Sequence, residues 1–402
     1  MFFSKEAKQG EKMLRKRQTI SLKWLLLGVL ITNTAMSFIW PLNTIYIHET
    51  LHKSLVIAAS VLFLNQLATM LGSLIGGKLF DSWSPYYSIL LGIALNIFAL
   101  GGLVFFHAWP SYALLLILSG LANGISVTCE NSLATRVGNH RSSYVFNLLY
   151  FASNFGLVFG TLTVGYIMPL GIGYIFAIAT IIQLLFLVVA VINYNIQINQ
   201  ISISRSGTES KGKLTPKILG ALIMVLICWL IYEQWQSNLS TFMVEKGFKV
   251  KNYSFLWTFN AILIVLFQPV VTHFDELLLK HIRGRLNTGI LLLLASFALL
   301  LLPFKDNYGL YVTSMCLLTL GEILLFPGVA SFVDIESPKN LTGYYQGRVQ
   351  MFSALGKAIG PLFGALIIDN TNYEFLFLIC VLMAFLSLLI FTLPVISASK
   401  KF

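Results

Sequence analysis

Charged side chains are scarce in this sequence. Asp, Glu, Lys and Arg together make up 11% of its 402 residues, whereas hydrophobic residues make up 57%. In a soluble domain about 25% of the residues are charged. The composition therefore excludes an ordinary soluble globular protein and indicates an integral membrane protein.

Cysteines and catalytic motifs are scarce as well. The four cysteines lie far apart inside apolar runs, so they predict neither a disulfide framework nor a zinc site: Cys129, Cys228, Cys316 and Cys380. The sequence contains no nucleophile elbow, Walker loop, HExxH motif or His/Asp cluster. We therefore expect no enzymatic activity, no metal and no cofactor. Without an ATP-binding loop, any transport would be driven by a gradient.

Long apolar runs fill the chain. A helix needs roughly 20 residues to cross about 30 Å of hydrocarbon, and twelve runs reach that length. These runs predict an all-α membrane protein with twelve transmembrane helices. Their bounds are Leu22–Ile47, Leu55–Gly77, Tyr86–His107, Tyr112–Ala134, Tyr144–Met168, Ile172–Tyr194, Ile218–Met243, Tyr253–His273, Leu286–Pro303, Tyr308–Val333, Tyr344–Ile368 and Phe375–Val395.

The spans fall into two halves of six. The polar, Ser- and Lys-containing segment 195–217 predicts a cytoplasmic linker between an N-terminal half, 22–194, and a C-terminal half, 218–395. Residues 1–21 form a basic leader and residues 396–402 a tail. Gly-x-x-x-Gly occurs in the fifth span and again 200 residues later in the eleventh: Gly156 and Gly160, Gly356 and Gly360. This repetition favours a duplication, with two pseudo-repeats around a central cavity.

Basic residues are unevenly distributed over the loops. Most of the 27 Lys and Arg residues fall on the leader, linker, tail and loops of one side. The other side holds only Lys53, Lys246, Lys249, Lys251 and Lys305. This bias predicts a multi-pass protein of the cell membrane with both termini in the cytoplasm. The net charge of +11 then reflects attraction to anionic lipid rather than to nucleic acid.

Three local patterns resemble the major facilitator superfamily, and in particular its multidrug/proton antiporters. "WPLNTIYI" (Trp40–Ile47) is similar to the first-span Pro-Leu-x-x-x-Tyr segment of drug exporters, and "GGKLFD" (Gly76–Asp81) resembles the superfamily's loop motif after the second span. "GEILLFP", followed by "SPKNLTGYYQG", is similar to the tenth span and the next loop of the antiporters. It also partly resembles proton-coupled peptide transporters.

The sequence departs from the family patterns at two places. After Asp81 the family has a basic run, but "DSWSPYYS" contains no base. The antiporter signature has Gly-Pro where Gly160-Thr161 stands, and a proline appears instead at Pro361 in the eleventh span. From the loop and span motifs we select Gly77, Asp81, Pro327 and Pro361, together with the four repeated glycines, as gating candidates.

Three acids lie inside the predicted spans: Glu130, Glu233 and Glu322. The resemblance implies that spans one, four, seven and ten line the central pathway, and these acids fall on spans four, seven and ten. Glu322 is near mid-membrane, where an ionised carboxylate costs a few kcal/mol. Pro327 deprives a nearby carbonyl of its helical donor. Glu130 is near the inner end of its span, so pairing with Arg136 or Arg141 is an equal alternative to substrate contact.

Lys357 is a base inside the eleventh span, at a depth close to that of Glu322. Two interpretations stay open. The two charges could form a fixed structural pair, or they could form a switch that opens when Glu322 is protonated or when substrate binds.

Other polar and aromatic side chains are candidates to line the cavity. Each polar one alone is more often an interhelical hydrogen bond. Trp40, Trp229, Trp235 and Trp257 could form walls for flat or cationic ligands, although packing or interfacial anchoring is favoured for any one of them. The candidates are Asn33, Trp40, Asn43, Asn123, Tyr232, Gln236 and Asn260.

These observations predict a secondary transporter that works by alternating access. We expect proton-coupled export of hydrophobic, often cationic, small molecules by a monomer in the lipid bilayer. The alternative is a proton-coupled importer of a small nutrient or peptide. A membrane-embedded synthase or a receptor would need a catalytic cluster or a soluble signalling domain, and the sequence has neither.

Overall fold

The computed structural model describes residues 19–39, 43, 46–167, 170–196 and 212–399. Within these ranges the regular structure is helical, and an isolated bridge between Ile20 and Val137 is the only β pairing. Ten of the described helices are long and apolar enough to cross a membrane. The predicted all-α membrane protein is confirmed, and the helices are consistent with twelve spans in two repeats.

The chain divides into two compact units. Unit 1 comprises Met1–Lys213 and Ser337–Gln350, and unit 2 comprises Leu214–Glu336 and Met351–Phe402. The division after Lys213 falls within the predicted linker, of which 197–211 lie outside the described residues. One helix, α15 (Thr342–Asn370), begins in unit 1 and continues into unit 2.

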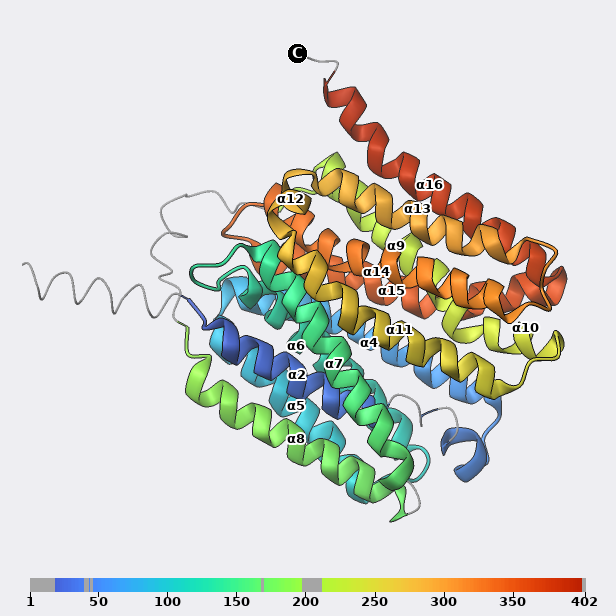
Figure 1. The fold of residues 1–402 in the computed structure, drawn as a ribbon. Coiled ribbons are helices and arrows are strands. Elements are labelled where there is room, and N and C mark those ends of the chain that lie inside the picture. Colours follow the sequence, from blue (N-terminus) through green and yellow to red (C-terminus); the bar gives the residue numbers. More distant parts are fainter. Residues whose placement is uncertain (1–18, 40–42, 44–45, 168–169, 197–211, 400–402) are drawn as a thin grey trace, which may run out of the picture. The chain divides into compact units, whose positions relative to one another are not determined.

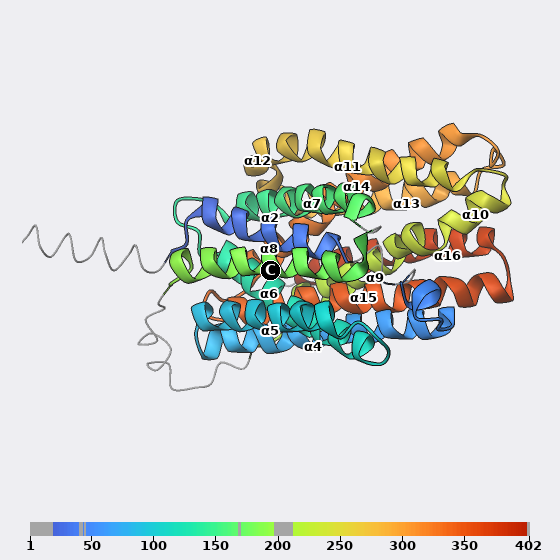
Figure 2. The ribbon, with the colours of Figure 1, turned by 90° about the horizontal axis from the view of Figure 1, so that it is seen from below.

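Both units are built of helices that run alongside one another (Figures 1 and 2). The elements of unit 1 are α2 (Leu22–Ser37), the π-helical turn η2 (Tyr46–Thr50), α4 (Leu55–Ser82), α5 (Pro85–Phe105), α6 (Ser111–Ala134), α7 (Ser142–Ile167) and α8 (Ile172–Asn193). Those of unit 2 are α9 (Pro216–Ser237), α10 (Leu239–Glu245), α11 (Val250–His273), α12 (Asp275–Lys280), α13 (Ile282–Leu300), α14 (Tyr308–Glu336) and α16 (Tyr373–Ser399).

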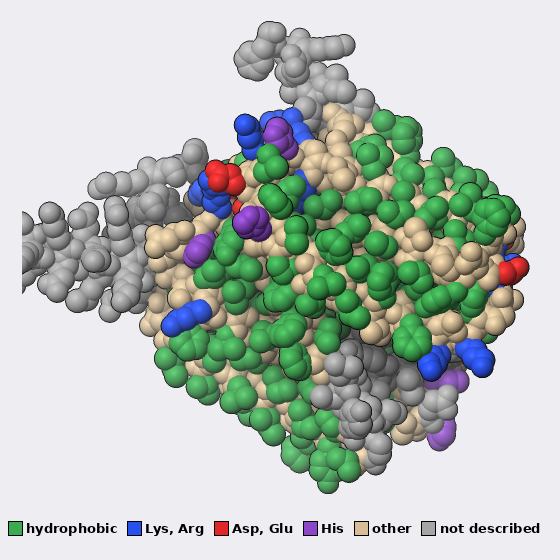
Figure 3. Space-filling model, viewed as in Figure 1, with side chains coloured by type: hydrophobic (Ala, Val, Ile, Leu, Met, Phe, Trp, Pro, Cys, Tyr) green, Lys and Arg blue, Asp and Glu red, His purple; other side chains and the backbone are tan. Residues whose placement is uncertain are grey.

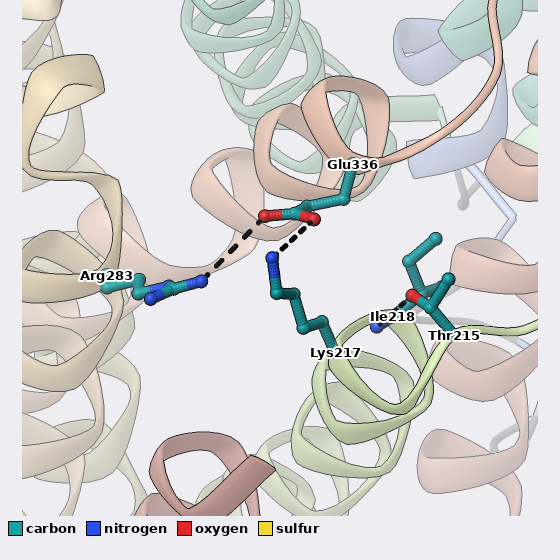
Figure 4. Close-up of polar contacts among 5 residues, drawn as sticks. All are labelled: Thr215, Lys217, Ile218, Arg283 and Glu336. Carbon is teal, nitrogen blue, oxygen red and sulfur yellow. Dashed lines mark hydrogen bonds and ion pairs between the residues drawn. The ribbon is translucent and has the colours of Figure 1, made fainter. Parts of the chain in front are cut away.

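The helix starts follow ordinary capping chemistry. Ser84 caps α5 and Thr215 caps α9, and in both helices a proline occupies the first turn, where its missing N–H is not needed. The Thr215 hydroxyl accepts the N–H of Ile218 at 3.3 Å (Figure 4). These serine and threonine caps therefore fix where the helices begin after short polar loops.

The predicted first span is not one continuous helix over the described residues. We expected a helix over Leu22–Ile47, whereas α2 ends at Ser37. Pro41 explains this end, because it has no N–H to donate to the carbonyl of Ser37 and disfavours helical geometry in the residue before it. Trp40, one of the predicted cavity residues, lies outside the described residues.

The second span is longer than predicted. Gly77 and Asp81 lie inside α4, which continues to Ser82, and not in a loop as the motif suggested. The helix continues through these glycines, which allow α4 to pack closely on α6. A Cβ on Gly76 would lie only 2.8 Å from the Cα of Ile125 in α6. The loop between α4 and α5 is therefore shorter than predicted and consists only of the residues between Ser82 and the start of α5.

Apolar side chains face outward along the helices. Hydrophobic side chains cover most of the face drawn in Figure 3. Large residues such as Phe98, Ile192 and Leu366 are more than half exposed in the absence of lipid. Such a surface is the one expected of helices that meet a bilayer.

The repeated glycines mark the same contact in the two units. A Cβ on Gly156 of α7 would lie 2.7 Å from the carbonyl oxygen of Leu30 in α2, and one on Gly356 of α15 would lie 2.5 Å from that of Leu226 in α9. In each unit the fifth long helix therefore packs directly on the backbone of the first. This shared geometry supports the duplication inferred from the sequence.

We predict that Gly356→Ala lowers the melting temperature of the detergent-solubilised protein, because overpacking of this kind typically costs about 1–3 kcal/mol. The matched control is Gly101→Ala in α5, where the added Cβ would meet Thr180 at an ordinary 3.7 Å. Alanine is also the better helix former, so the control should melt at or above the wild-type temperature. Equal melting temperatures for the two variants would contradict the packing argument.

Candidate functional site

Glu322 lies at the centre of α14. It is midway between the two ends of the helix, about 21 Å from each at 1.5 Å per residue, and only 5% of its surface is exposed. The helix continues through Pro327, whose missing N–H leaves the carbonyl of Ile323 without a helical donor. The acid is thus as far from both helix ends as α14 allows.

Two neighbouring helices hold the Glu322 carboxylate. The Tyr232 hydroxyl of α9 donates to its Oε2 at 2.9 Å, and the Asn260 amide of α11 donates to the same oxygen at 3.0 Å. Asn260 also donates to the Thr319 hydroxyl at 2.9 Å, one helical turn from Glu322. A buried carboxylate requires such donors, since an unsatisfied one would be strongly destabilising.

Aromatic rings cover one side of this acid. Trp229 stacks on Phe326 with ring centroids 4.0 Å apart and an interplanar angle of 10°. Tyr232 meets both rings edge-on, at 5.3 and 5.7 Å, and Trp257 packs against Tyr232 at 6.2 Å. Trp229 and Trp257 thus belong to a group of rings in contact with Tyr232, whereas Trp235 is fully buried.

Lys357 lies against the same wall. Its ammonium nitrogen is 3.8 Å from the centroid of the Trp229 ring, and the charges of Glu233 and Glu322 both act on it. Within the described part of the chain, Lys357 forms no ion pair of 4.0 Å or less. The ammonium group thus contacts an aromatic face, with both carboxylates in its electrostatic surroundings.

Close packing of α15 on α9 brings these groups together. A Cβ on Gly356 would lie 2.8 Å from Cβ of Trp229, and one on Gly360 would lie 2.6 Å from Cβ of Glu233. The Gln234 amide donates to the carbonyl of Gly360 at 2.8 Å. Lys357, directly after the first glycine, therefore lies beside Trp229 and Glu233. Pro361 is also inside α15, where it removes the helical donor for the carbonyl of Lys357.

Glu130 belongs to unit 1. It is 3% exposed near the end of α6, and the Thr32 hydroxyl of α2 donates to it at 3.4 Å. No ion pair of Glu130 is found among the residues that the structure describes, and Arg136 donates to the carbonyl of Lys339 instead. The predicted alternative, a pair with Arg136 or Arg141, is therefore not what the structure shows.

The remaining polar candidates are dispersed. Asn33 donates to Ser153 at 3.3 Å, which joins α2 to α7, and Asn43 accepts from the Tyr112 hydroxyl at 2.8 Å. Asn123 and Gln236 are partly buried. The surroundings of Gly160 lie outside the described residues.

Asp81 caps the start of α15. Its two carboxylate oxygens accept the N–H groups of Gly343 and Tyr344, at 2.8 and 2.6 Å. A Cβ on Gly77 would meet the carbonyl oxygen of Gly343. Both motif residues therefore serve one contact, in which a carboxylate meets the electropositive end of a helix.

A second charged contact lies at the C-terminal end of α14. Glu336 accepts from Lys217 at 3.3 Å and is 3.9 Å from Arg283, so it links the starts of α9 and α13 (Figure 4). The side chains are 25–39% exposed. Such exposed pairs contribute about 0–1 kcal/mol.

Sequence reasoning missed three residues of the site: Phe326, Thr319 and Gln234. Phe326 and Thr319 are four residues after and three before Glu322, so helical spacing already places them on its face. That spacing is the signal that could have found them. Gln234 had no such signal, because its contact depends on the packing of α15.

Comparisons with known proteins agree with this architecture. The family model described as Major Facilitator Superfamily matches residues 25–358. The chain belongs to the Major Facilitator Superfamily. The MFS-type transporter YttB of Bacillus subtilis (strain 168) is 35% identical over 373 residues, which is 92% of this chain and 93% of YttB. The chain is accordingly a multi-pass MFS-type transporter of small molecules and not an enzyme.

Two solved structures have the same fold. A bacterial homologue of the iron transporter ferroportin, in an outward-facing state with soaked iron, superposes with a TM-score of 0.75 at 15% identity, covering 93% of this chain and 98% of the other. The human organic anion transporter MFSD10 (TETRAN) gives 0.73 at 12% identity, covering 94% and 99%. At these identities the likeness concerns the MFS fold alone.

We predict that Asp81→Asn lowers the melting temperature of this MFS protein. The substitution removes the charge and leaves one acceptor oxygen for two N–H donors, and a hydrogen bond to a charged group contributes about 1.5–3 kcal/mol. The control is Asp306→Asn, which changes the net charge equally at an exposed position. A melting temperature equal to that of the control would show that the cap is not stabilising.

Proposed function

We propose that the chain is a proton-coupled exporter of hydrophobic, often cationic, small molecules. One observation carries this proposal: a carboxylate at the midpoint of an apolar helix, held by Tyr232 and Asn260 and bordered by aromatic rings. A proton can neutralise such a carboxylate, and aromatic faces bind hydrophobic and cationic groups. Glu322 would be the proton-coupling acid, with Glu233, Lys357 and Glu130 as further charged groups of the pathway.

The fold does not select the substrate. The two structural neighbours are an organic anion transporter and a bacterial homologue of an iron transporter, so one architecture serves ligands of opposite charge. The proposal for this chain therefore rests on its own acids and rings. Its location in the cell membrane and its cytoplasmic termini belong to the same proposal and are supported by the distribution of basic residues. A monomeric state is part of the proposal as well.

We predict that Glu322→Gln abolishes transport driven by a pH gradient while downhill exchange of substrate continues. The amide keeps the shape and the acceptor oxygen but cannot exchange a proton. The measurement is dye uptake into inverted vesicles with an imposed pH gradient, beside counterflow without a gradient. Glu336→Gln, on the same helix, is the matched control and should keep full activity. Active accumulation by Glu322→Gln would remove this acid from the coupling mechanism.

Vesicles of the two orientations separate the exporter from the importer. Accumulation of dyes in inverted vesicles with an acidic interior supports export. Accumulation of peptides or sugars in right-side-out vesicles, driven by inward proton movement, would support the alternative instead.

We predict that Glu233→Gln changes charge selectivity. If its carboxylate attracts the substrate, transport of divalent cations should fall most, that of monovalent cations less and that of neutral compounds least, in the order of their Coulomb attraction. The measurement compares initial rates for three compounds of similar size. Glu245→Gln, at an exposed position of α10, is the control. An equal loss for all three compounds would assign Glu233 a structural role.

A further inference from the structure

The contact between Lys357 and Trp229 differs from the other cation–ring contacts of the described residues. Its nitrogen-to-centroid distance is 3.8 Å, whereas the other described lysine nitrogens lie 5.2 to 6.0 Å from a ring centroid. At 3.8 Å the ammonium group lies on the ring face, where the attraction is strongest. The Lys357 ammonium group therefore lies directly against the face of the Trp229 ring.

The two faces of the Trp229 ring have different occupants. The Phe326 ring, parallel at 4.0 Å, covers one face. A nitrogen at 3.8 Å from the same centroid would collide with that ring if it lay on the same side, so the ammonium group occupies the opposite face. The Trp229 ring is thus held between an aromatic ring and a cation.

The surroundings of this face suit a cation that comes from outside. Glu233 and Glu322 both act electrostatically on the group that lies there. Trp229, Phe326 and Lys357 are each partly exposed. Lys357 also has a long flexible stem, so its ammonium group can leave the ring without movement of α15.

From these observations we infer that Lys357 competes with the substrate. When no substrate is bound, its ammonium group occupies the face of the Trp229 ring that the cationic group of a lipophilic monocation takes during transport. This inference rests on the proposed function and adds a substrate class, organic ammonium or phosphonium ions of single charge. It also assigns a role to the lysine. Substrate enters by displacing Lys357, which stays within the field of the two carboxylates.

The test is equilibrium binding of tetraphenylphosphonium to the full-length protein in lipid nanodiscs. Lys357→Met keeps the length and the apolar stem but removes the competing charge. We expect its Kd to be about tenfold lower than that of the wild type, which corresponds to about 1.4 kcal/mol. Lys357→Gln should show the same direction, and Lys357→Arg should bind as the wild type does.

A control separates competition for the ring from a general charge effect. If Lys357 competes for the Trp229 face, then in a Trp229→Leu background the gain from Lys357→Met should shrink to less than about twofold. A gain that stays tenfold would overturn the inference, because charge alone would explain it. Lys251→Met, which removes a lysine 5.4 Å from the Phe255 ring, should leave the Kd unchanged. Lys357→Met and Lys357→Gln should likewise leave the Kd of the uncharged probe triphenylphosphine oxide unchanged.

Failure of the inference is distinguishable from failure of the proposed function. If the wild type binds and pumps tetraphenylphosphonium but the two uncharged variants, Lys357→Met and Lys357→Gln, do not tighten binding, only the role of Lys357 is overturned. If neither the wild type nor any folded variant binds the cation, cation export fails and the inference fails with it.

Discussion

The need to satisfy a carboxylate in the middle of an apolar helix governs unit 2. Glu322 cannot reach water at either end of α14, so its hydrogen-bond donors must come from other helices. Tyr232 of α9 and Asn260 of α11 supply them, and both donate a hydrogen bond to the carboxylate oxygen Oε2. Three helices are thereby fixed around one charge. Tyr232 also connects this carboxylate to the aromatic rings, because it meets the stacked pair of Trp229 and Phe326 edge-on.

Glycine packing then brings the opposite charge into place. Gly356 and Gly360 allow α15 to approach α9 so closely that Lys357 lies beside Trp229 and Glu233. The same type of contact, Gly156 of α7 on the backbone of α2, occurs in unit 1. There it carries no base, since the residue after Gly156 is Leu157. The close glycine contact thus occurs in both units, and the cluster of Glu233, Glu322 and Lys357 lies in unit 2.

Much of the fold followed from the sequence because bilayer thickness fixes the length of each apolar run. The three acids could be found in the same way, since a charged residue inside an apolar run is energetically costly and indicates a function. Details that depend on packing could not be found. The end of α2 at Ser37 needed attention to Pro41, and the capping of α15 by Asp81 joins residues more than 250 positions apart. The seat of Lys357 on Trp229 depends on helix rotation, which hydropathy does not determine.

The net charge of the cluster in unit 2 bears on the proposed exchange of protons for cations. Two carboxylates and one ammonium group leave the cluster of Glu233, Glu322 and Lys357 with one uncompensated negative charge when all three are ionised. In a medium of low polarity such a charge is neutralised by binding either a proton or a single cation. Binding of both at once would leave a positive charge, which is equally unfavourable. Under the proposed function, a site with this composition would exchange one proton for one monovalent cation, and a neutral substrate would require that the proton stay bound.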